Sequence, residues 1–103
     1  MKINGRDVHF LYTIRAYIQT NEWVANNENK SAAEARLRQA IFMHEAYLKA
    51  NGSQEALLTI EELEDMPVYV LTEILQEADA AVAEGSKRKV ESAPKKKEKE
   101  ART

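Results

Sequence analysis

Apolar residues repeat at the three- and four-residue spacing of amphipathic helices in three stretches of the chain. In the first stretch, within residues 10–27, the shared face consists of Leu11, Ile14, Tyr17 and Ile18. In the second, within residues 31–52, it consists of Leu37, Ala40, Ile41, His44, Tyr47 and Leu48. In the third, within residues 67–85, it consists of Leu71, Ile74, Leu75, Ala78 and Val82. The pattern predicts three principal helices.

Residues that satisfy unpaired backbone groups mark the ends of these helices. Ser31 and Glu34 form an S-x-x-E capping box at the start of the middle helix. Gly52 follows it and can adopt the left-handed conformation that ends a helix. In "LTIEELEDMP" the capping pattern recurs and predicts a short additional helix. Pro67 is expected in the first turn of the last helix, and Gly85 at its end.

The N-terminal "MKINGRDVHF" predicts a short β-hairpin. Asn4-Gly5 is a preferred dipeptide for a tight type I′ turn, in which both central residues have positive φ. Ile3, Val8 and Phe10 supply an apolar face. Such a short hairpin is stable only when it packs on other elements, so we expect it to lie against the helices.

Charge is distributed unevenly and separates a tail from the body. The net charge is −2 over 103 residues, but residues 53–84 contain nine acids and no base, whereas residues 85–103 contain eight bases and three acids. The tail lacks aromatic residues and is rich in Lys, Glu, Ser and Pro, a composition typical of disorder. We therefore expect a mostly α fold in residues 1–84, with the hairpin followed by a small bundle of about three main helices, and a disordered charged tail in residues 85–103.

Composition excludes several classes of protein. Without cysteine, the chain has no disulfide framework, thiol nucleophile or Cys-based zinc site. No apolar run approaches the roughly 18 residues that a membrane span needs, and "MKINGRDVHF" lacks the apolar core of a signal peptide. These features predict a soluble intracellular protein that does not interact with membranes.

Neither the histidines nor the carboxylates form a catalytic or metal-binding motif. His44-Glu45 is not an H-E-x-x-H pair because position 48 is Leu, so the simpler interpretation is an exposed His9 and a part-buried, hydrogen-bonded His44. The acidic residues of the C-terminal half are expected to form a solvated face, or a docking surface for a basic partner. They are Glu61, Glu62, Glu64, Asp65, Glu73, Glu77 and Asp79.

The basic tail has two interpretations. Its lysines and arginines could bind nucleic-acid phosphates in a salt-sensitive way. Against this, no aromatic residues are interleaved for base stacking, three glutamates dilute the charge, and the preceding helix is acidic. The alternative is a flexible solvated segment.

The segment "KINGRDVHFLYTIRAYIQTNEW" resembles the opening of tail assembly chaperones from long-tailed phages and prophages of Gram-positive bacteria. A middle helix with "AIFMHEAY", the connector "LTIEELEDMP", a last helix and a charged tail are also similar to that family. The resemblance covers residues 1 to about 85.

The resemblance implies a non-catalytic protein without cofactor, metal or catalytic residues. Such chaperones bind the tape measure protein, a long, helix-rich, aggregation-prone chain, and keep it soluble in the host cytoplasm while tail tube protein assembles around it. They are typically missing from the mature virion and can stack into spirals, so a homo-oligomer is expected. Part of an apolar stripe on the second or last helix is expected to serve as a client or self-association site: Ile41, Tyr47, Leu71, Ile74, Leu75 and Val82.

Two other functions stay open at this point: a small nucleic-acid-associated or regulatory protein acting through its tail, and a structural tail or connector component. The resemblance adds one hypothesis about the tail. Lys95, Lys96 and Lys97 can be encoded by an adenine-rich run, on which a ribosome can shift frame to make the longer form found in many of these chaperones.

Overall fold

The computed structural model describes residues 1–87, and it confirms a mostly helical fold with an N-terminal hairpin. Most of the segment predicted to be disordered, residues 88–103, lies outside this range. The elements in chain order are β1 (Lys2–Ile3), β2 (Arg6–Asp7), α1 (Ile14–Asn26), α2 (Ala32–Ala50), α3 (Ile60–Glu64) and α4 (Val68–Ser86).

The hairpin has the predicted turn and packs on the helices as expected. Asn4 and Gly5 have φ values of 52° and 79°, as a type I′ turn requires. The strands pair in antiparallel register with Lys2 opposite Asp7. Ile3 and Val8 are buried in the core. Outside the core, the hairpin is joined to the segment before α3, because the guanidinium of Arg6 donates to the carbonyl of Ala56.

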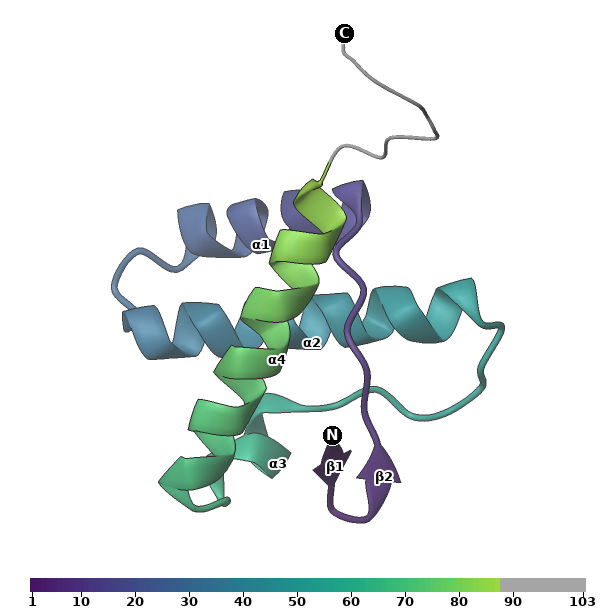
Figure 1. The fold of residues 1–103 in the computed structure, drawn as a ribbon. Helices are drawn as coiled ribbons and strands as arrows, with labels where there is room; N and C mark the ends of the chain where they lie inside the picture. The colour runs from purple at the N-terminus through teal and green to yellow at the C-terminus, as the bar shows by residue number, and fades with distance from the viewer. Residues whose placement is uncertain (88–103) are drawn as a thin grey trace, which may run out of the picture.

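The first helix begins later than its apolar pattern suggested, at Ile14, because the residues before it bond to α2. The backbone N–H of Leu11 donates to the Met43 carbonyl at 3.0 Å. The Nδ1 atom of His44 lies 2.9 Å from the His9 carbonyl oxygen and donates to it. Thr13 then caps α1 by accepting from the N–H of Ala16. Residues 8–13 are therefore an extended strap across α2, beside α4 (Figure 1).

The middle helix agrees with its predicted ends and face. The Ser31 hydroxyl accepts from the N–H of Glu34 at 3.1 Å. Gly52 has a φ of 63°, and the N–H groups of Gly52 and Ser53 donate to the carbonyls of Lys49 and Leu48, which completes a Schellman motif. Along the predicted face, the buried residues are Ala40, Ile41, His44 and Leu48, and the half-buried residues are Leu37 and Tyr47.

The last helix departs from its predicted ends at two positions. Pro67 is the N-cap of α4 and lies just before its first turn. Its ψ of 154° is extended, so the chain changes direction here between α3 and α4. Gly85 does not end α4, which continues to Ser86. A Cβ atom at Gly85 would lie 2.7 Å from the carbonyl oxygen of Tyr12. The glycine therefore permits close packing against the strap, and it is not a C-terminal cap.

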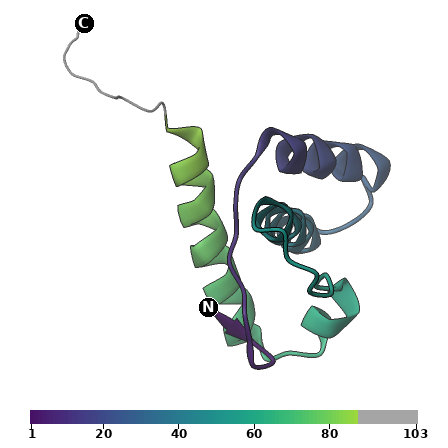
Figure 2. The ribbon, with the colours of Figure 1, turned by 90° about the vertical axis from the view of Figure 1, so that its right-hand side faces the viewer.

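The second helix is the centre of the fold, because α1, α3 and α4 each pack against it (Figures 1 and 2). The turned view shows α1 and α4 on different sides of α2, with the strap between them. An ion pair between Arg36 and Asp79 also connects α2 to α4. The core lies where the hairpin, the strap and the helices meet, and includes Ile3, Val8, Ala16, Met43, Ile60, Ile74 and Ala78.

Candidate functional site

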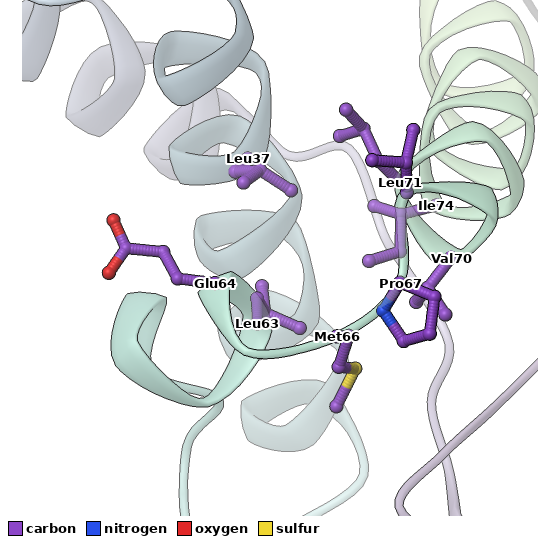
Figure 3. A pocket seen from close by; sticks show the side chains of 9 residues that line it. Leu37, Leu63, Glu64, Met66, Pro67, Val70, Leu71 and Ile74 are labelled. Carbon is purple, nitrogen blue, oxygen red and sulfur yellow. The ribbon is translucent and has the colours of Figure 1, made fainter.

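An apolar groove lies where α2, α3 and α4 meet (Figure 3). Its volume is about 170 Å³. Drug-sized ligands occupy larger pockets of about 300–1,000 Å³, whereas an apolar cavity of about 150 Å³ accepts a single benzene ring. The groove therefore has room for about one large side chain. It is lined by Leu37, Leu63, Glu64, Met66, Pro67, Val68, Val70, Leu71 and Ile74.

The turn between α3 and α4 builds this groove. Thr59 caps the start of α3 by accepting from the N–H of Glu62. Pro67 lies shortly after the end of α3 at Glu64, and the helix cannot continue through it. The chain then reverses into α4, so that Leu71 points toward Leu37 of α2 across the groove (Figure 3). Ile74 is 2% exposed and closes the floor. The groove is thus a direct extension of the core.

Two large side chains at the start of α4 remain in solvent beside the groove. Val68, which lines it, is 77% exposed, and Tyr69 is 65% exposed. Water contact with such side chains is unfavourable by about 25 cal/mol per Å² of apolar surface. A partner that covered them would gain this free energy, which makes the rim a natural contact surface.

The surroundings of the groove are acidic. Glu64 lines it, and in Figure 3 its carboxylate points away from Leu71 toward the outer edge. Glu61, Asp65 and Glu73 are exposed on α3 and α4, and no Lys or Arg occurs between residues 53 and 84. On the α2 side, Arg36 is paired with Asp79 and Arg38 lies over the Trp23 ring. The α3 and α4 sides of the groove therefore favour a partner with basic side chains.

The six residues predicted as a contact site do not form one surface. Leu71 and Ile74 line the groove. Ile41 is buried, while Leu75 and Val82 are half-buried. Tyr47 lies elsewhere, beside His9, with the two ring centroids 4.9 Å apart.

The most exposed apolar stripe lies on α1, which the prediction did not select. Ile14 is 80% exposed, Tyr17 54% and Ile18 47%. The inner side of α1 combines small residues with one large ring. Ala16 is fully buried and Thr20 half-buried, and the half-buried Trp23 ring lies against Arg38 of α2, with the guanidinium 5.5 Å from the ring centroid. This second pattern, with Ala16, Thr20 and Trp23 at helical spacing, is the signal in the sequence that could have shown which face packs on α2.

The structure places the histidines as expected, with His9 exposed and His44 1% exposed. No three acidic or histidine side chains in residues 1–87 converge as metal ligands do. Apart from Glu62, which is half-buried and accepts from the Asn4 side chain, the predicted acidic face is exposed. Within the described range, every helix is too short or too polar to cross a membrane.

A scan against models of protein families, a search of curated proteins and a search of solved structures each found no match to this chain.

Proposed function

We propose that this protein is a phage tail assembly chaperone that binds the tape measure protein and keeps it soluble during tail assembly. The observation that carries the proposal is the groove between α2, α3 and α4. The connector "LTIEELEDMP", one of the segments that resemble the chaperone family, supplies Leu63, Glu64, Met66 and Pro67 to that groove. The resemblance and the geometry thus point to the same place in the molecule.

The client fits the chemistry of the groove. A helix laid across it would insert one large apolar side chain between Leu37 and Leu71, and would cover Val68 with the neighbouring turn. Lysine or arginine residues flanking the anchor would face Glu64 and Glu73. An amphipathic helix with basic residues is therefore the client that this groove favours, and a tape measure protein, which is long and helix-rich, would offer many candidate helices.

The remaining parts of the proposal follow from this role. The chaperone is non-catalytic, acts in the host cytoplasm and leaves before the virion is complete. A longer form made by frameshifting at Lys95–Lys97 would bring tail tube protein to the same client. Lysine codons without a slippery run and without an overlapping downstream frame would contradict the longer form. They would leave the proposed role of the groove unaffected.

Co-expression with the tape measure protein of the same phage tests the proposal, with pull-down and the soluble fraction as readouts. We expect the tape measure protein to be soluble and bound to this chain. Val68→Asp should reduce binding about 30-fold, because it places a charge at the apolar rim.

Ile14→Asp is the matched control. Ile14 is also the first residue of a helix, β-branched and about as exposed as Val68, at 80% against 77%. An aspartate in the first turn is favourable to either helix, so both variants should fold. A tape measure protein that stays insoluble and unbound would contradict the proposed function. Equal loss of binding in both variants would contradict the groove as its site.

A further inference from the structure

The outer face of α1 has the properties of a contact surface for a second copy of this chain. Among the described elements, α1 packs against α2 alone, so its opposite side is uncovered (Figure 2). We define the α1 face as Ile14, Arg15, Tyr17, Ile18 and Glu22. Its apolar residues are about half exposed or more, and a shallow hollow runs along it between Ile14, Arg15, Ile18, Gln19 and Glu22.

The charges on this face are opposite in sign and lie along one edge. Arg15 and Glu22 are seven residues apart, which is two helical turns or about 10 Å, so they project from the same side of α1. Within residues 1–87 neither has an ion-pair partner. Arg15 also lies in the first turn, where the helix dipole disfavours a positive charge. Its position is therefore not explained by the stability of α1 itself.

This arrangement is self-complementary under two-fold symmetry. If two copies of α1 run antiparallel, with the axis midway between Ile18 and Gln19, residue 15 of each copy lies opposite residue 22 of the other. A two-fold axis perpendicular to the plane of the two helices places both of these 15–22 pairs on the same edge of the interface. Arg15 of each copy then faces Glu22 of the other copy, so the interface contains two equivalent ion pairs. The two Ile18 side chains flank the axis, and Ile14 packs over the small Ala25 of the other copy.

We propose that this protein forms a closed, antiparallel homodimer through the α1 face. This dimer is independent of the proposed function, because the groove between α2, α3 and α4 remains free in it. A closed pair also differs from the open stacking that the family resemblance implies, which needs two different surfaces. One helix face buries less than the roughly 800 Å² per partner of a standard interface. We therefore expect a weak dimer with a dissociation constant on the order of 10–100 µM.

Sedimentation equilibrium of the full chain, from about 10 µM to about 500 µM to span that constant, tests the dimer. Wild type should change from monomer to dimer over this range. Arg15→Glu and Glu22→Arg should each weaken dimerisation about tenfold or more, because each replaces two attractions with two repulsions. Both reversals suit the dipole of α1, so circular dichroism should show unchanged folding. Ile14→Asp should also weaken the dimer.

Mixing the two charge-reversed variants provides the sharpest test. One copy then carries two glutamates and the other two arginines at these positions, so the mixture should form a heterodimer at least as stable as the wild-type homodimer. Glu73→Arg, an equal charge change on α4, should dimerise like wild type. A monomeric wild type at every concentration would overturn the proposal. So would a dimer insensitive to both reversals, or a mixture that stays monomeric.

Discussion

Two apolar surfaces of this molecule differ in how they are built, and the difference indicates what each one binds. The groove is concave, is formed by three helices, and has a buried floor at Ile74. The α1 face belongs to one helix, has only a shallow hollow along it, and contains no buried residue. Within residues 1–87, Glu64 is the one charged residue that lines the groove, whereas the α1 face contains one charge of each sign. A groove built from three helices with charge of one sign favours a different molecule as partner, and the face of one helix with balanced charges is able to pair with itself.

The largest expected effect comes from truncating the same residue type on the two surfaces. Ile74→Ala should lower the free energy of unfolding by about 2–5 kcal/mol, because it leaves a cavity under the groove. Ile14→Ala should change it by less than about 0.5 kcal/mol, because that side chain is already in water. Urea denaturation measures both values. Similar losses for the two variants would mean that the α1 face is part of the core.

The next effect concerns the contact that fixes α4 beside the strap leading into α1. Gly85→Ala would bring a Cβ atom to 2.7 Å from the Tyr12 carbonyl oxygen, a backbone atom that cannot move away alone. Overpacking costs about 1–3 kcal/mol, and the higher helix propensity of alanine returns up to about 1 kcal/mol. We expect a net loss of about 1–2 kcal/mol in thermal or urea denaturation. Ser86→Ala, at the exposed next residue, is the control and should cause no loss.

A smaller effect separates the two surfaces by charge. Glu64→Gln should weaken binding of a basic client helix about 2–5-fold, as expected for one partly solvated ion pair. The same variant should leave dimerisation unchanged, because Glu64 is remote from α1. Glu28→Gln, in the loop after α1, matches the charge change and should affect neither. Fluorescence anisotropy of a labelled client peptide measures the first effect. A client affinity unchanged in Glu64→Gln would indicate that the acidic border plays no part.

The smallest effect lies in the hairpin, outside both surfaces. The Lys2 side chain, 3.1 Å from Asp7 across the strands, lowers the pKa of that carboxyl below its ordinary value by hydrogen bonding and by charge. The unfolded chain then binds more protons in the acidic range, so the pair stabilises the fold above the ordinary pKa of aspartate. This contribution disappears as the pH falls through the lowered pKa.

Both side chains of the pair are about 70% exposed, so the effect is small. Lys2→Gln should be slightly less stable than wild type near pH 7, with urea midpoints that converge at strongly acidic pH. Client binding and dimerisation should not change. A difference that grew toward low pH would contradict the assignment of this pKa.

Local features of the sequence were sufficient to predict the elements. Asn4-Gly5, Ser31, Gly52 and Thr59 each act on the backbone within a few residues, and all four have the predicted role. These effects do not depend on distant parts of the chain. Leu71 and Ile74, two of the six residues proposed as contacts, line the groove, because α4 follows directly from the turn at Pro67.

Tertiary structure alone decided the rest. The strap over residues 8–13 is extended because its backbone bonds to α2, about 35 residues away. Position 85 requires a glycine because the Tyr12 backbone lies against it. Ile14, Tyr17 and Ile18 of α1 face outward, because the side that packs on α2 is formed by Ala16, Thr20 and the Trp23 ring against Arg38. A helical pattern shows that two faces exist. Which face is buried depends on the shape of the surface it meets, and that surface is formed by residues distant in the sequence.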